Sequence, residues 1–278
     1  MVMQSLKTLT IVGPGRLGSA IGRVLHRSGA VTLLDIVGRD PARTADAARF
    51  MGGGAASTGE VPLRAADIYL LAVPDDAIED YGQTLAAGND LAGATVFHCS
   101  GALGSDRLAA ARDAGAAVAS VHPVRSFADP AQVAATFAGT CCGVEGDADA
   151  LEVLVPIFES IGARMVTIDA AHKTLYHAAA VFASNYVVTL IDVAVQVYGK
   201  AGVPPEIALE MIEPLLQESA GNALRLGPAA ALTGPIARGD VATVARQQAA
   251  LADWNPSYAR LYAEFADATA RLAASRTP

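Results

Sequence analysis

The sequence predicts an α/β protein in which a doubly wound sheet domain, residues 1–168, is followed by an all-α domain, residues 169–278. Up to residue 169, short apolar runs alternate with amphipathic helical segments, which is the pattern of a mostly parallel sheet covered by helices. The expected strands lie at 31–37, 67–73, 94–100, 116–122, 139–144 and 164–169, after a first one that precedes residue 13. Beyond them the strand pattern stops, and helical periodicity covers 170–200, 205–226, 240–252 and 256–274.

The composition is that of a globular protein with no general affinity for polyanions. The chain is 52% hydrophobic with 26 Gly, which suits layered α/β structure. A net charge of -8 disfavours binding to nucleic acid or an anionic membrane. The adjacent Cys141 and Cys142, with Cys99, lack metal-ligand spacing and are interpreted as packing residues rather than a disulfide. With no signal peptide pattern at the N-terminus, we expect a cytoplasmic protein and no metal site.

A glycine motif follows the first strand. Gly13, Gly15 and Gly18 form G-x-G-x-x-G between that strand and a helix. The first glycine permits the tight turn, the second lets the backbone approach a pyrophosphate, and the third lets the helix pack on the strand. The N–H groups at the helix start favour an anion. We therefore predict a Rossmann-type dinucleotide site that also includes Pro14, Arg16 and Leu17.

The end of the second strand distinguishes the two nicotinamide cofactors. Asp40 and Pro41 read as the N-cap and first position of the next helix, which places Arg39 at the strand tip and Asp35 inside the strand. An arginine there accommodates the 2′-phosphate of NADP, whereas an acid binds the ribose of NAD. The sequence favours NADP(H), and the alternative is that Asp35 is the ribose ligand while Arg39 is solvated.

Polar residues follow the other strands at the edge where ligands of such sheets bind. The strand ends read Pro74-Asp75-Asp76, His98-Cys99-Ser100-Gly101 and His122-Pro123, and the chemistry is expected there. Val73, Pro74 and Ser100 are expected to contact the cofactor.

The segment "KTLYHAAAVFASNYVVTLIDVAVQV", residues 173–197, is long enough to span a membrane, for which about 20 apolar residues suffice. At about 100° per residue, however, its polar side chains share one arc of about 160°. Asp192 near a bilayer centre would also cost about 2.5–3.5 kcal/mol. We therefore expect one long helix of a protein that does not span a membrane, with a polar stripe facing another domain or a substrate.

Four residues of that stripe lie at its end nearest the sheet domain. They are Lys173, His177, Ser184 and Asn185. If the helix starts beside the cofactor, all four could reach it. The alternatives are that His177 is a hydrogen-bonded core residue and that Asn185 caps a neighbouring helix.

Four motifs carry a resemblance to a known family: "FHCSGALGSDRL", "SVHPVRSFAD", "YHAAAVFASNYVVTL" and "ALTGPIARGDVATV". They resemble proteins that pair a Rossmann-like, NADP-oxidoreductase-type domain with the domain of unknown function 2520. That group is similar to the pyrroline-5-carboxylate reductases and other proteins with a 6-phosphogluconate dehydrogenase-type C-terminal domain. The resemblance implies that Pro74 and Ser100 lie along the nicotinamide half, and that His122, His177 and Asn185 surround the substrate. It also implies a homodimer formed through the helical domain.

From these residues we expect a reductase of a small, anionic carbonyl or imine compound. His177 is the expected proton donor because its ordinary pKa is near neutrality, with Lys173 as the reserve acid. Ser100 and Asn185 would bind the reacting atom. Arg238, in the loop "LTGPIARGD", suits the grip on a substrate anion, in its own site or the partner's, or it serves only the interface. The alternatives are an NADP oxidoreductase that uses a deazaflavin coenzyme, and a non-catalytic NADP-binding sensor.

Overall fold

The structure is a computed structural model that describes residues 6–59 and 62–275 and divides into two compact units after Ser184. We call the part up to Ser184 the sheet unit and the part from Asn185 the helical unit. The domain boundary expected after residue 168 falls before the last helix of the sheet unit, and it stays a prediction. The first five residues, in which no signal peptide is predicted, lie outside the described residues.

The sheet unit contains an eight-stranded sheet with the order β3-β2-β1-β4-β5-β6-β7-β8. Among the described residues β7 runs antiparallel to β6, while all other neighbouring strands are parallel, so the predicted mostly parallel sheet is confirmed. β3 was not predicted because it is only three residues long and carries no apolar pattern. The strands are β1 (Thr8–Val12), β2 (Thr32–Val37), β3 (Ala55–Ser57), β4 (Ile68–Leu71), β5 (Thr95–His98), β6 (Ala117–Pro123), β7 (Cys141–Gly146) and β8 (Arg164–Thr167).

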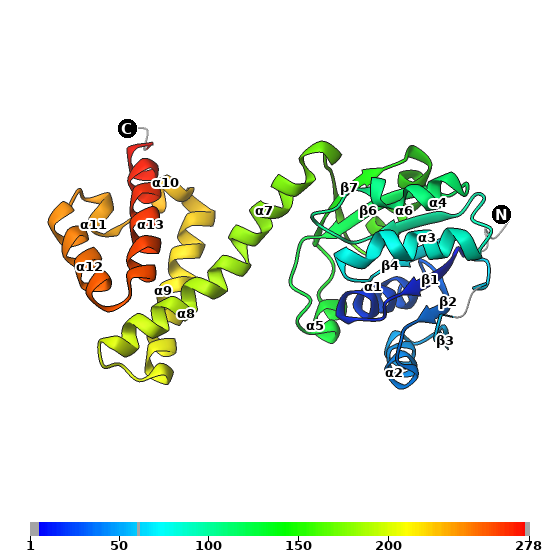
Figure 1. The fold of residues 1–278 in the computed structure, drawn as a ribbon, viewed down its shortest axis with the longest axis horizontal. Helices are drawn as coiled ribbons and strands as arrows, with labels where there is room; N and C mark the ends of the chain where they lie inside the picture. The colour runs from blue at the N-terminus through cyan, green and yellow to red at the C-terminus, as the bar shows by residue number, and fades with distance from the viewer. Residues whose placement is uncertain (1–5, 60–61, 276–278) are drawn as a thin grey trace. The chain divides into compact units, whose positions relative to one another are not determined.

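Helices cover both faces of this sheet (Figure 1). Successive side chains of a strand point to opposite faces, and in β4 Ile68 and Leu70 join one apolar core while Tyr69 and Leu71 join the other. The first core is closed by α1, α2, α5 and α6, and the second by α3 and α4. The helices are α1 (Arg16–Arg27), α2 (Pro41–Met51), α3 (Ile78–Gly88), α4 (Ala109–Asp113), α5 (Pro130–Ala135) and α6 (Ala148–Ser160), with 3₁₀ turns at Asp75–Ala77, Ser105–Leu108 and Ala170–His172.

The long helix expected over 170–200 is interrupted. α7 (Lys173–Ala183) ends at Ser184, whose backbone leaves the helical region at φ -128° and ψ -72°, and α8 (Asn185–Lys200) starts at the next residue. Serine and asparagine side chains compete with the helical backbone for its hydrogen bonds, which favours a break at this pair. The expectation of one uninterrupted helix is therefore wrong at Ser184, while the polar stripe stays a prediction.

The stretch Ala170–Lys200 that contains this break is long and apolar enough, by length and composition alone, to cross a membrane. It is the one such stretch in the part of the chain that the structure describes, and none of its most apolar window is buried within the chain.

The helical unit follows the predicted segments closely. Pro205 and Pro256 occupy the first helical turns of α9 and α13, and the side chains of Asp240 and Asn255 accept hydrogen bonds from the first backbone N–H groups of α12 and α13. α12 and α13 pack side by side (Figure 1). The helices are α8, α9 (Pro205–Leu226), α10 (Pro228–Ala231), α11 (Gly234–Ala237), α12 (Val241–Trp254) and α13 (Pro256–Ala274).

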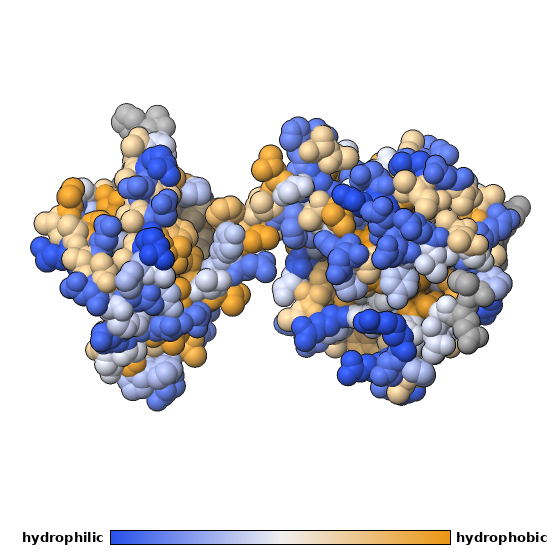
Figure 2. Space-filling model, in the orientation of Figure 1, coloured by the Kyte–Doolittle hydropathy of each residue, from blue (hydrophilic) through white to orange (hydrophobic). Residues whose placement is uncertain are grey.

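Large apolar side chains remain exposed on α8 and α9. Val188 is 68% exposed, Leu215 60% and Leu224 90%. Figure 2 shows apolar and polar residues interspersed over the visible face of the helical unit. These exposed apolar side chains lie on neighbouring helices of the helical unit.

Candidate functional site

The glycine turn after β1 has the geometry of a pyrophosphate cradle. Gly13 has φ +90°, and a Cβ there would lie 2.6 Å from the carbonyl oxygen of Ala72. A Cβ on Gly18 would lie 2.4 Å from the Gly13 carbonyl oxygen, so only glycine lets α1 approach the turn this closely. The N-cap of α1 is Gly15, which supplies no side-chain cap, so the first N–H groups of the helix are left for a ligand.

A cavity of about 590 Å³ opens over this turn within the sheet unit. It is formed by the ends of β1, β2 and β4, where an open parallel sheet binds its ligands. The predicted residues Gly13, Pro14, Gly15, Arg39, Val73 and Pro74 line it, together with Arg43, Thr58, Tyr81 and others. Arg16, Leu17 and Gly18 instead form the start of α1 below it.

The two residues considered as ligands of the adenosine ribose or its 2′-phosphate, Arg39 and Asp35, occupy different positions. Arg39 lines the cavity and Asp35 does not. The Asp35 carboxylate is nearly buried and accepts a hydrogen bond of 2.9 Å from Nε of Arg64, and another of 3.3 Å from the Arg64 backbone N–H. Asp35 is thus already paired, while Arg39 and Arg43 supply positive charge at the cavity.

A hydrogen-bonded turn connects the cavity to the end of β5. Ser100 Oγ donates to Asp75 Oδ2 at 2.8 Å and accepts from the backbone N–H groups of Ala102 and Leu103. His98 is fully buried; its Nδ1 accepts from Ser100 N–H, and its Nε2 lies 3.0 Å from the Gly104 carbonyl oxygen. The Ser100 hydroxyl, predicted to bind the reacting atom, is therefore engaged in holding this turn.

Two imidazoles meet next to that turn. His122 lies in β6 and His177 in α7, with ring centroids 5.7 Å apart and planes at 78°. A Cβ on Gly101 would lie 2.4 Å from Nδ1 of His177 and 2.8 Å from Nε2 of His122. The two nitrogens therefore converge beside Gly101, where only a glycine leaves room for both rings. His177 Nδ1 is buried and has no hydrogen-bond partner within the chain.

The other side of His122 contacts a residue that the sequence analysis missed. The hydroxyl of Tyr176 lies 2.9 Å from His122 Nδ1, and the rings meet edge to face. Burial, followed by the nearby His177 and Lys173, lowers the pKa of His122 to about 4, against a small opposing effect of Asp75. His122 is therefore neutral near pH 7. Tyr176 directly precedes His177, but nothing in the local sequence distinguishes it from a packing tyrosine.

Lys173 is buried beneath this site rather than facing it. Its Nζ lies 3.0 Å from Oε1 of Glu145 and also donates to Ser120 Oγ. Glu145 in turn accepts from the backbone N–H and the hydroxyl of Ser105, at 2.9 and 2.7 Å. Burial lowers the pKa of Lys173, and the hydrogen bond with Glu145 opposes that shift. This network anchors the first turn of α7 to β7.

Asn185 and Arg238 belong to the helical unit. Asn185 begins α8, and Arg238 ends α11 just before Gly239, which has φ +71°. Their roles at the reacting atom and at a substrate anion stay predictions. Over the described residues, no group of three or more His, Cys, Asp and Glu side chains could hold a metal ion, and the three cysteines are free thiols.

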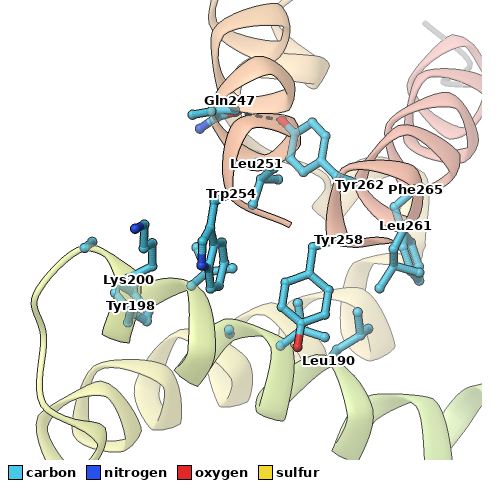
Figure 3. A pocket seen from close by; sticks show the side chains of 15 residues that line it. Leu190, Tyr198, Lys200, Gln247, Leu251, Trp254, Tyr258, Leu261, Tyr262 and Phe265 are labelled. Carbon is cyan, nitrogen blue, oxygen red and sulfur yellow. Dashed lines mark hydrogen bonds between the residues drawn. The ribbon is translucent and has the colours of Figure 1, made fainter. Parts of the chain in front are cut away.

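The helical unit has its own apolar cavity of about 570 Å³, between α8, α12 and α13. Figure 3 shows the side chains of Trp254 and Tyr258 pointing toward α8, while the Tyr262 hydroxyl donates to Gln247 Oε1 at 2.7 Å. No acidic, histidine or cysteine residue is among the residues that line it. Its ionisable lining residues are Lys200, Tyr198, Tyr258 and Tyr262, and the rest of the lining apart from Gln247 is apolar.

The architecture is a doubly wound sheet of the nucleotide-binding type joined to a helical unit. Two family models match the chain: the Rossmann-like domain over residues 2–123 and the Domain of unknown function (DUF2520) over residues 140–269. The chain thus carries a Rossmann-like domain followed by a DUF2520 domain, as its motifs predict. No curated protein matches this sequence.

Solved structures share this fold over nearly the whole chain. A protein of Bacteroides fragilis described as a candidate NADP oxidoreductase is 21% identical with a TM-score of 0.78, covering 96% of this chain and 98% of its own. A Thermotoga maritima protein is 28% identical with a TM-score of 0.74, at the same coverage of 96% and 98%. A reductive aminase of Aspergillus terreus, solved with NADPH and ethyl-5-oxohexanoate, is 18% identical with a TM-score of 0.64, covering 97% and 90%.

Proposed function

We propose that this protein is an NADP-dependent oxidoreductase that reduces a small carbonyl or imine compound. The observation that supports it best is the convergence of His122 Nε2 and His177 Nδ1 over Gly101. It occurs in the same unit as the glycine turn and the cavity that carries Arg39. A nucleotide cradle and a pair of acid–base groups are the two parts that such a reaction requires.

The residues of the cavity fit an NADP cofactor. The glycine turn and the start of α1 would hold its pyrophosphate, and Arg39 its 2′-phosphate, with Arg43 close by. When bound, this cofactor supplies the hydride, so the protein need only orient the substrate and provide a proton. The NADPH-bound reductive aminase of the same fold supports the same choice of cofactor.

His177 is the proposed proton donor because its Nδ1 has no hydrogen-bond partner within the chain and lies beside Gly101, close to His122 Nε2. His122 would bind the substrate there as a neutral imidazole. Ser100 would then act by holding the turn that contains Gly101, since its hydroxyl is occupied. Lys173, the reserve acid, would need to leave its buried pair with Glu145 to donate a proton, which makes His177 the better candidate.

We propose a homodimer formed through the helical unit. The exposed apolar residues of α8 and α9 support it, as does the resemblance to proteins whose helical domains dimerise. α9 also carries Glu206, Glu210, Glu213 and Glu218, which suit a protein partner rather than a lipid bilayer. Arg238 would then bind a substrate anion in its own or the partner's site. Sedimentation at several protein concentrations tests this, and a monomer at all of them would refute it.

The experiment for the proposed activity combines binding and turnover. NADPH affinity is measured by calorimetry, and NADPH oxidation is then followed with a panel of small oxo acids, ketones and cyclic imines, with and without ammonia. We expect tight NADPH binding and turnover of at least one compound. Binding without turnover would favour a sensor, and turnover only with a deazaflavin would favour the coenzyme-exchange reaction.

A further inference from the structure

We propose that Tyr176 is a positioning residue that fixes the tautomer of His122, so that the His122 Nε2–H points at the reacting atom of the substrate beside His177. This proposal rests on the proposed reductase function and assigns a role to a residue outside the nucleotide cradle. It concerns only residues of the sheet unit.

The first step of the argument is the space made for the tyrosine. His122 in β6 pairs across the sheet with Gly143 in β7. A Cβ on Gly143 would lie 2.5 Å from the Tyr176 hydroxyl oxygen and 2.9 Å from its ring carbon Cζ. Only a glycine opposite His122 lets the phenol reach Nδ1, at 2.9 Å. The packing of Tyr176 from α7 against β6 and β7 therefore depends on the absence of a side chain at Gly143.

The second step is the direction of the hydrogen bond. Burial, with the neighbouring Cys142 and Cys141, raises the pKa of Tyr176 to about 12, against an opposing backbone hydrogen bond from Gly143. Burial lowers the pKa of His122 to about 4; His177 and Lys173 of α7 add to this, while Asp75 opposes it. Between these values the phenol keeps its proton and the imidazole is neutral. Because the phenol oxygen already accepts the Gly143 backbone hydrogen bond, we assign the phenol as the donor to Nδ1, which places the ring proton of His122 on Nε2.

His98 shows the same principle in a neighbouring strand. Its Nδ1 accepts a hydrogen bond of 3.1 Å from the Ser100 N–H, which leaves the proton on the Nε2 that faces the Gly104 carbonyl. In both histidines the partner of one nitrogen determines which nitrogen carries the hydrogen. The partner of His98 is structural, whereas Nε2 of His122 lies beside Gly101 and His177.

The third step is what that tautomer provides. His122 Nε2 and His177 Nδ1 lie 2.8 and 2.4 Å from the position that a Gly101 Cβ would occupy. An oxygen or nitrogen of the substrate that lies beside Gly101, within hydrogen-bond reach of both nitrogens, would accept a hydrogen bond from His122 and take its proton from His177. His122 keeps its own proton throughout. The opposite tautomer would present a lone pair to the substrate atom and repel it.

The test measures the tautomer directly. The chain has five histidines, so long-range ¹H–¹⁵N correlation spectra of the unliganded protein resolve each imidazole, with assignments from single substitutions. At pH 7.5 we expect His122 and His98 each as one Nε2–H tautomer. In Tyr176→Phe, His122 should become a mixture of both tautomers while His98 is unchanged.

Two further variants guard against a general loss of structure. Gly143→Ala should displace the phenol and give the same His122 spectrum as Tyr176→Phe. Tyr69→Phe removes another buried hydroxyl, which accepts from the Ala66 N–H at 3.0 Å, and should leave the His122 spectrum unchanged. An Nδ1–H tautomer in the wild type, or a Tyr176→Phe spectrum identical to it, would overturn the proposal.

Turnover separates this proposal from the function on which it rests. With a substrate from the panel, Tyr176→Phe should lower kcat about tenfold and leave NADPH affinity unchanged. Unaltered kcat in a variant whose tautomer has changed would refute the positioning role while the reductase function stands. If His122 is the Nε2–H tautomer in a protein that reduces no compound of the panel, the reductase function is refuted. The role of His122 as a hydrogen-bond donor to the substrate is then refuted with it.

Discussion

Lys173 Nζ lies 3.0 Å from Glu145 Oε1 inside the sheet unit, and the two side chains are only 2% and 6% exposed. This ion pair joins the first turn of α7 to β7. Because residues three and four apart share a helix face, it sets the position of Tyr176 and His177 one turn further on. The chemistry proposed for His177 therefore depends on a pair of charges that never touches the substrate.

Breaking this pair should destabilise the protein strongly. Lys173→Met or Glu145→Gln leaves one buried group unpaired and should lower the free energy of unfolding by about 3–5 kcal/mol. The double change Lys173→Met with Glu145→Gln should cost less than the sum of the two single changes. Urea unfolding, followed by a signal from the sheet unit, measures the free energy of unfolding of each variant. Arg107→Ala, which breaks the exposed pair with Glu79, is the control and should cost less than about 1 kcal/mol; equal losses would contradict the account.

Adding one methyl group at Gly101 should block the reaction. In Gly101→Ala the new Cβ would overlap both imidazole nitrogens and displace the two rings, so turnover should fall about a hundredfold while NADPH affinity is retained. Gly82→Ala is the matched control, because its Cβ meets Leu108 only at an ordinary 3.5 Å. Steady-state kinetics and NADPH titration are the measurements. Full activity in Gly101→Ala would place the chemistry elsewhere.

Cofactor choice should depend on Arg39 and not on the pair formed by Asp35 and Arg64. Arg39→Ala should weaken NADPH binding about tenfold to a hundredfold, through the loss of a charged hydrogen bond to the 2′-phosphate, and leave NADH binding unchanged. Arg64→Ala removes the partner of Asp35, which does not line the cavity. It should therefore leave the ratio of the NADPH and NADH affinities unchanged. Calorimetry measures both. Equal affinity of the wild type for NADH and NADPH would show that the role assigned to Arg39 is wrong.

Acid should destabilise the protein through His122. Its pKa is about 4 in the folded chain and 6.5 in the unfolded one, so below pH 6.5 the unfolded state binds more protons. The stability contribution is complete above pH 6.5 and is lost progressively down to about pH 4, by up to about 3 kcal/mol. Unfolding free energies of wild type and His122→Gln across this range measure it. The variant should lose less stability; parallel curves would contradict the lowered pKa.

The sequence predicted the parts of the fold and site that depend on local patterns. The glycine turn, Arg39 at the tip of β2, and the caps Asp240 and Asn255 are all signalled within a few residues. The break at Ser184 was missed because helical periodicity continues through it and only the competing side chains of Ser184 and Asn185 hint at an end.

The missed site residues depend on contacts between distant segments. Glu145 ends the strand "CCGVEG" and gains its meaning only from Lys173, 28 residues later. Tyr176 meets His122 across 54 residues and needs Gly143 on a strand whose antiparallel pairing is not evident from its composition. Lys173 was read as a possible acid because its burial could not be seen from the helix pattern.

The most direct test of the central claim is isotope transfer. NADPH deuterated at C4 is incubated with the wild type and each compound of the panel, and the products are analysed by mass spectrometry. The account predicts a product that carries one deuterium, formed by the wild type and by Gly82→Ala but not by His177→Ala, while all three bind NADPH. Tight NADPH binding with no deuterated product from any compound would contradict it.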